Sequence, residues 1–189
     1  MALPLRGMFS MALLEQRALL RLHSKNVFVA ADVFEVGKEI GGRRLNAVGW
    51  NFSKHFIGTT ENGVGETEIA VWTLLYAADD DFILEALDGQ SNGGACSLAN
   101  IHTLMTLGGY AFNRLDGQSN FAYINSPVDQ SLWAAHWWLN NKNEWIIGSV
   151  QVPHPAIDWR AGSCLFTSKG HVVSHETPAQ DGLNHSAPP

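Results

Sequence analysis

The sequence has little positive charge. Its 189 residues include 12 Lys and Arg against 18 Asp and Glu, which leaves a formal net charge of −6. The basic residues are scattered, so they form no strip that would neutralise a phosphate backbone. We therefore expect no nucleic-acid partner.

The chain also lacks an apolar run near the roughly 20 residues that span a bilayer, and we expect no membrane contact. Glu15, Gln16 and Arg17 interrupt what would be the hydrophobic stretch of a secretory signal. We interpret residues 9–23 as a first helix. The alternative is an amphipathic organelle leader, since such leaders are rich in Arg and poor in acidic residues.

Cysteine is scarce. Cys96 and Cys164 are too few for a disulfide scaffold. The two cysteines would form one disulfide in an exported protein or stay reduced in the cytosol. Of these two locations, we favour the cytoplasm. With 46% hydrophobic and 16% charged residues, the composition is typical of a water-soluble globular protein. The length suits one core, predicted over residues 1–175, followed by a polar tail over 176–189.

Two further helices are predicted in the first two thirds of the chain. The helical spacing of Ile69, Trp72 and Leu75 predicts a helix over 66–78. A second is predicted over 97–107, because its apolar face ends at Gly108, a helix terminator. Between residues 26 and 57, β-branched and aromatic residues punctuated by glycines indicate a meander of strands.

Strands dominate after residue 132. Residues 132–139 and 145–152 flank Asn140-Asn141-Lys142-Asn143, which predicts a hairpin with a four-residue loop. Residues 163–168 and 171–174 are expected to form another hairpin. The predicted fold class is thus α+β, with helices followed by an antiparallel sheet.

Two groups of residues resemble metal ligands, but neither predicts a site. Asp79, Asp80 and Asp81 are consecutive and cannot all face one ion. His171 and His175 share a strand face, yet they lie too far apart to chelate easily. We expect no metal and no cofactor.

The phrase Leu-Asp-Gly-Gln-Ser-Asn occurs twice, at 87–92 and 115–120. Asp-Gly is a strong turn signal, so both copies are expected to end an element and reverse the chain.

One stretch carries residues suited to thiol chemistry. Cys96 lies at the predicted start of the 97–107 helix, where the helix dipole would favour a thiolate. Gly93-Gly94 would allow a tight turn and leave backbone amides free as oxyanion donors.

The segment from Gln90 to Cys96 resembles the papain-like cysteine protease signature, in its compact, viral-leader-protease-like form. The resemblance covers about residues 88–152 and implies helices first and strands afterwards. It also implies a Cys96 nucleophile, a Gln90 oxyanion donor and a His136 base at a strand. The implied activity is a thiol hydrolase, a cysteine protease or related acyl-transfer enzyme, acting on a polypeptide.

The residue that would orient His136 stays open. With a loop at 140–143, His136 lies opposite Ile147, and Ser149 and then Gln151 share its face. Asp158 would orient the imidazole better if the chain folds back.

Three other hypotheses remain. Cys96 is a plain buried residue in the first, because free cysteine packs well as a small hydrophobe. In the second, the chain is a non-enzymatic structural or interaction protein, such as a subunit of a larger assembly or virion. It would contact protein partners through the Trp-rich hairpin. The third is a carbohydrate-binding module that uses exposed Trp.

Overall fold

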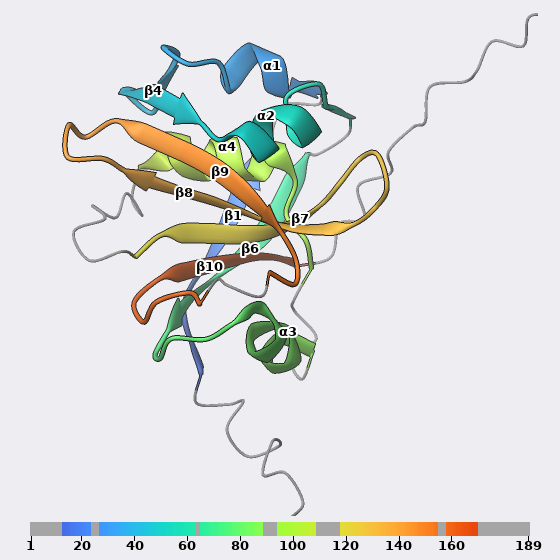
Figure 1. Ribbon diagram of the computed structural model, residues 1–189, viewed down its shortest axis with the longest axis vertical. Helices are drawn as coiled ribbons and strands as arrows, with labels where there is room; N and C mark the ends of the chain where they lie inside the picture. The colour runs from blue at the N-terminus through green and yellow to red at the C-terminus, as the bar shows by residue number, and fades with distance from the viewer. Residues whose placement is uncertain are drawn as a thin grey trace, which may run out of the picture.

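A computed structural model describes residues 13–23, 27–62, 65–88, 94–108, 118–154 and 158–169. These residues build an eight-stranded sheet in the order β1-β6-β10-β7-β8-β9-β4-β3 (Figure 1). The strands in that order are β1 (Leu14–His23), β6 (Glu66–Leu74), β10 (Cys164–Lys169), β7 (Asn120–Asn125), β8 (Leu132–Leu139), β9 (Trp145–Gln151), β4 (Arg43–Val48) and β3 (Glu39–Ile40). A separate two-stranded sheet pairs β2 (Val27–Val29) with β5 (Thr60–Asn62).

Four short helices cover the large sheet unevenly. Three of them, α1 (Ala30–Val33), α2 (Trp50–Phe56) and α4 (Leu98–Leu107), lie on one side, and α3 (Asp80–Asp88) lies on the other (Figure 1). We call these sides the three-helix face and the α3 face. Because helices lie on both sides, the central strands are buried on both faces. The sequence of such a strand is a nearly continuous run of apolar residues.

Each face has its own hydrophobic cluster. On the three-helix face, Phe52 and Phe56 of α2 pack with Trp137 and Phe166 of the sheet. On the α3 face, Phe121 and Trp159 stack with ring centroids 4.0 Å apart. Neighbouring residues of one strand belong to different clusters, as Phe121 and Ala122 do, because side chains alternate across a strand.

The predicted fold class, helices followed by an antiparallel sheet, is wrong. Strands begin at Leu14, and helices are interspersed among them. The sheet is mixed, since β10 runs parallel to β7 and β4 runs parallel to β9.

Two predicted helices are strands. Residues 14–23 form edge strand β1, whose bulge at Arg17 interrupts the two-residue repeat and so hides it in the sequence. Residues 66–74 form β6, which pairs with β1 on one side and β10 on the other. Because β6 has a neighbouring strand on each side, it is covered on both faces: Ile69 and Val71 belong to the cluster of the three-helix face, and Ala70, Trp72 and Leu74 belong to that of the α3 face. Apolar residues on both faces gave the spacing that imitated a helix.

The predicted helix at 97–107 is confirmed. Helix α4 begins after the N-cap Ser97, whose side chain accepts a hydrogen bond from the Asn100 amide, and it ends at Gly108 with φ of 63°. The positive φ explains why glycine stands there, because other residues rarely adopt this conformation.

The predicted meander over 26–57 is correct only in part, because it also contains α1 and α2. The acidic triplet is a helix start. Asp79 Oδ1 accepts a hydrogen bond from the Phe82 amide at 2.9 Å, and α3 begins at Asp80. Such an oxygen satisfies an amide that otherwise has no partner at a helix N-terminus.

The Trp-rich hairpin forms, but its register is shifted by one residue. His136 pairs with Gly148 rather than Ile147, because Glu144 belongs to the loop and Leu139 pairs with Trp145. Asn140 holds this longer loop together, with its side-chain oxygen accepting from the amides of Lys142 and Glu144.

Other predictions lie outside the described residues. These are the second strand of the last hairpin at 171–174, His171, His175 and the tail at 176–189. No helix in the described part of the chain is long and apolar enough to cross a membrane.

Candidate functional site

Cys96 lies in the hydrophobic cluster of the three-helix face. Its side chain is 5% exposed, and its Sγ lies 3.5 Å from the backbone oxygen of Phe166 on β10. Its backbone amide donates to the Tyr123 oxygen of β7 at 2.8 Å, which fixes it against the sheet. The thiol is therefore enclosed by apolar side chains rather than open to a substrate.

A different residue occupies the N-terminus of α4. The carboxylate of Glu61, 4% exposed, accepts hydrogen bonds from the amides of Leu98 at 2.8 Å and Ala99 at 2.9 Å. These are the amides whose dipole was expected to stabilise a Cys96 thiolate. Burial, followed by the nearby Glu61 charge, raises the pKa of Cys96 to about 12. The environment keeps the sulfur protonated, the reverse of what a thiol nucleophile needs.

His136 lies on the opposite side of the sheet. His136 pairs with Phe121, and its ring lies 5.8 Å from the ring of Trp159. Phe121 and Trp159 both belong to the cluster of the α3 face. Cys96 belongs to the cluster of the three-helix face. The structure thus separates the two proposed catalytic residues by the sheet itself and does not bring them together.

The structure brings none of the other predicted site residues that it describes to Cys96. Gln90 lies outside the described residues. Asp158 is exposed and directly precedes Trp159, whose ring lies 5.8 Å from that of His136. The register shift places Ser149 opposite Ala135 and Gln151 opposite Trp133, on the strand face that His136 does not share.

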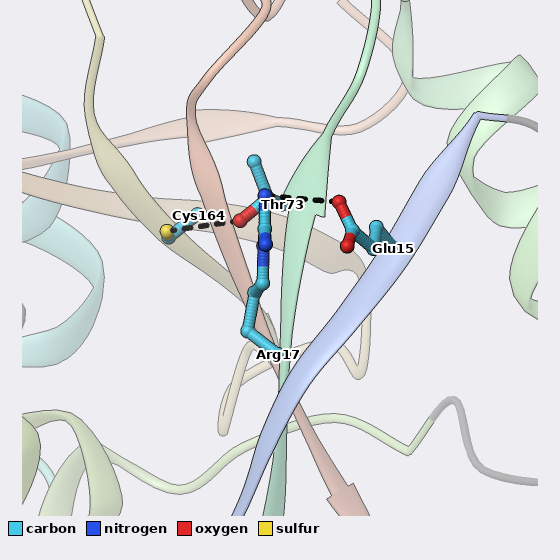
Figure 2. Close-up of polar contacts among 4 residues, drawn as sticks. All are labelled: Glu15, Arg17, Thr73 and Cys164. Atoms are coloured by element: carbon cyan, nitrogen blue, oxygen red, sulfur yellow. Dashed lines mark hydrogen bonds and ion pairs between the residues drawn. The ribbon is translucent and has the colours of Figure 1, made fainter.

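The second cysteine is also buried. Cys164 on β10 lies beside Thr73 on β6, with 3.9 Å between sulfur and hydroxyl oxygen (Figure 2). On β1, Glu15 forms an exposed ion pair with Arg17 at 2.9 Å (Figure 2). Burial raises the pKa of Cys164 above its usual value, against the lowering effects of Thr73 and Arg17.

Most of the tryptophans are core residues. Trp133, Trp137, Trp145 and Trp159 are each at most 5% exposed. Trp138 is half-buried, and Trp50, which the sequence analysis did not single out, is 71% exposed. Among the tryptophans of the described residues, the exposed surface therefore belongs to Trp50 and in part to Trp138 rather than to the whole hairpin.

These two tryptophans line an open cleft of about 370 Å³ at the edge where β4 ends against β9. We call it the aromatic cleft. Its lining residues are Ala47, Val48, Gly49, Trp50, Asn51, His136, Trp138, Ile146, Ile147, Gly148 and Ser149. The volume falls in the range of small-molecule sites, about 300–1,000 Å³.

Two glycines let the chain segments approach closely here. A Cβ atom at Gly148 would lie 2.9 Å from His136 Nε2, and one at Gly49 would lie 3.1 Å from the Gly148 Cα. The imidazole therefore rests directly on the backbone of β9. His136 also stacks on Trp138, with centroids 5.2 Å apart and planes 27° apart, so the orientation of both rings is fixed.

Ser149 lines the aromatic cleft, but its side chain points to the three-helix face, since it pairs with Ala135 and shares the parity of Ile147. Ser149 is 5% exposed, and its hydroxyl oxygen has no hydrogen bond to any described residue. A buried hydroxyl without a partner is uncommon and costs free energy, so it calls for an explanation.

Sequence reasoning missed half of this site. The sequence predicts Gly49, Trp50 and Asn51 within a strand meander, whereas Trp50 and Asn51 begin α2. The available signal was Phe52 and Phe56, which are four residues apart and both buried, as on one face of a helix that begins after Gly49.

Among the described residues, no group of three or more His, Cys, Asp or Glu could hold a metal ion. Comparison with known protein families, with curated proteins and with solved structures gives no match to this chain. Nothing in these comparisons bears on the resemblance to papain-like proteases.

Proposed function

We propose that the chain is a non-enzymatic binding protein that recognises its ligand in the aromatic cleft. This keeps the interaction hypothesis drawn from the Trp-rich hairpin and moves the contact surface to the edge where β4, α2, β8 and β9 meet. The observation that carries the proposal is the 71% exposure of Trp50 beside the fixed His136–Trp138 stack.

The energetics favour a binding role for Trp50. The exposed indole of Trp50 does not gain the free energy of burial that most tryptophans of this chain gain on folding. When a ligand covers them, aromatic residues contribute more binding free energy than most other residue types. Lys54 Nζ lies 4.9 Å from the centre of the Trp50 ring, which restrains the ring from one side. A restrained aromatic surface loses less entropy when it binds.

The test is a fragment screen by two-dimensional NMR, with a library that mixes acidic, basic and neutral compounds. We expect the shifted amide signals to cluster at Gly49, Trp50, Gly148 and Ser149. Gly148→Val should abolish these shifts, because its side chain would displace His136 and fill the cleft.

The matched control is Tyr76→Ala. Tyr76 is also an exposed aromatic residue, 64% exposed, but it follows β6 and does not line the cleft. This variant should bind as the wild type does. Fragments that bind elsewhere, or that bind equally well after Gly148→Val, would overturn the proposal.

A further inference from the structure

We propose that β1 pairs antiparallel with β1 of a second copy of this chain and so forms a symmetric dimer. In the order of the large sheet, β1 has β6 on one side and no strand of the described residues on the other. An edge strand of ten residues offers a row of backbone donors and acceptors to another strand. The opposite edge, β3, has only two residues, so β1 is the edge with room for a partner.

Only the first half of β1 carries the features that protect an edge strand from pairing. Bulges and charged side chains are the usual protection. The bulge at Arg17 and the ion pair of Arg17 with Glu15 both lie in this half. Over residues 18–23 the pairing with β6 is regular, and Leu19 is 46% exposed. The second half of β1 is therefore the part suited to pairing.

The hydrogen bonds of β6 show which of its residues bond to β1. Successive residues of a strand direct their backbone groups alternately to the two neighbouring strands. The Leu74 amide donates to Ser163, which immediately precedes β10, and the Leu75 amide donates to Leu13, which immediately precedes β1. Odd-numbered residues of β6 therefore bond to β1, and even-numbered residues bond to β10.

The same pattern identifies the backbone groups of β1 that point outward. Beyond the bulge, odd-numbered residues of β6 pair with even-numbered residues of β1, as Ile69 does with Leu20. The even-numbered residues of this half therefore use their backbone groups on β6. Those that direct their amide and carbonyl groups to the outer edge are Leu19, Arg21 and His23.

Charge selects the register of the two strands. An axis of symmetry at Arg21 would set it opposite the partner's Arg21, and an axis at Leu19 would set Arg21 opposite the partner's Arg17. Like charges directly opposite each other are destabilising. An axis at Leu20 avoids both contacts, because it sets Arg21 opposite the partner's Leu19. Leu20 also lies near the middle of the regular stretch.

This register makes the edge complementary to itself on both faces. On the three-helix face, the two half-buried Leu20 side chains cover each other. On the α3 face, Leu19 lies over the alkyl stem of the partner's Arg21, whose guanidinium keeps its contact with Glu68 at 3.2 Å. Such a contact is isologous, as two-fold symmetry requires. The aromatic cleft lies near the opposite edge of the sheet, so the dimer leaves it open.

The test is sedimentation equilibrium of the full chain over protein concentrations from about 10 to 500 µM, because one strand pair is a small interface and the dimer should be weak. Leu19→Lys should weaken the dimer by about tenfold, since symmetry places an ammonium opposite Arg21 at both ends of the pairing. Leu19→Glu places a carboxylate there instead and should leave the dimer as strong or stronger. Both variants change an exposed side chain, so neither removes a core contact.

A cross-linking experiment tests the axis itself. In the proposed register Leu20 faces its own copy in a pair without hydrogen bonds, where the Cα atoms lie about 4.5 Å apart and a disulfide fits. We expect Leu20→Cys to form a disulfide dimer under mild oxidation. The matched control is Tyr76→Cys, at a residue that is 64% exposed and follows β6, which should stay monomeric. Cys96 and Cys164 are buried and should not contribute.

Three outcomes would overturn the dimer. The first is a monomer throughout the concentration range. The second is equal weakening by Leu19→Lys and Leu19→Glu, which would show that the loss of leucine rather than the opposition of charges matters. The third is cross-linking of Leu20→Cys that is no faster than that of Tyr76→Cys. None of these outcomes affects the binding function proposed for the aromatic cleft.

Discussion

Glu61 and Cys96 meet at the N-terminus of α4, and the carboxylate rather than the thiol takes the free amides. Glu61 bonds the amides of Leu98 and Ala99, while Cys96 precedes the N-cap Ser97 and faces hydrocarbon. The Glu61 charge raises the pKa of Cys96 further, after the larger effect of burial. One residue thus secures the helix and keeps the neighbouring sulfur neutral.

Replacing Glu61 should therefore destabilise the fold and make Cys96 more acidic. We expect Glu61→Gln to lower the free energy of unfolding by about 1–3 kcal/mol, because an amide accepts less strongly and turns N–H groups towards the helix amides. The measurement is urea denaturation, combined with hydrogen exchange of the first turn of α4. Glu85→Gln, on the exposed side of α3, should change neither quantity. Equal stability of the two variants would contradict this role.

The buried thiol of Cys96 should make stability fall at alkaline pH. Its pKa is about 12 in the folded protein, against 9.0 for an ordinary exposed thiol. Between these values the unfolded chain has lost the proton and the folded chain has kept it, so stability decreases as pH rises. By pH 10 the loss amounts to about 1.4 kcal/mol. Urea unfolding at pH 8 and pH 10 should show this extra loss in the wild type relative to Cys96→Ala. An identical pH dependence would show that the thiol titrates normally.

Some elements could be predicted from the sequence because local signals determined them. Helix α4 has a capping serine, an apolar face and a terminal glycine, and the hairpin β8–β9 has a polar loop between two alternating strands. Strands β1 and β6 lacked such clear signals. A bulge broke the repeat of β1, and apolar residues on both faces hid the repeat of β6. Whether a strand is central depends on distant partners, and a single sequence does not contain that information.

The candidate site was less predictable than the fold. His136 and Trp138 were singled out in the sequence, but their neighbours Gly49 and Trp50 come from a segment more than 80 positions earlier. The parallel pairing of β4 with β9 joins them, and parallel pairing leaves no turn signal. The thiol hypothesis relied on Cys96 and His136 sharing a face. The face of the sheet against which the N-terminus of a helix packs depends on the strand order. The spacing of Cys96 and His136 along the chain therefore could not show whether they share a face.

The buried Asp80 should be essential for the α3 face. Its Oδ1 accepts from the Tyr123 hydroxyl at 2.9 Å and from the Trp159 indole at 2.8 Å, with the carboxylate only 1% exposed. We expect Asp80→Ala to cost about 2–5 kcal/mol, because it leaves both donors buried without this acceptor. Asp80→Asn keeps an oxygen and should cost less.

The same pair of variants has a spectroscopic readout. Burial, then the Asp80 charge, raises the pKa of Tyr123 above its usual value. Ultraviolet titration of Asp80→Asn should therefore show Tyr123 ionising at lower pH than in the wild type, with Tyr123→Phe identifying the signal. Equal Tyr123 ionisation in Asp80→Asn and the wild type, at a pH where both remain folded, would contradict this effect of Asp80.

The separation of Cys96 and His136 predicts a specific pattern of thiol reactivity. In a Cys164→Ala background, Cys96 should react with iodoacetamide very slowly at pH 7 while the protein is folded, because the sulfur is 5% exposed and protonated. The rate should rise steeply once urea unfolds the chain. His136→Ala should leave the folded-state rate unchanged, since its ring lies across the sheet. Fast alkylation below pH 7 that His136→Ala abolishes would instead restore the thiol hydrolase and require a different arrangement of this sheet.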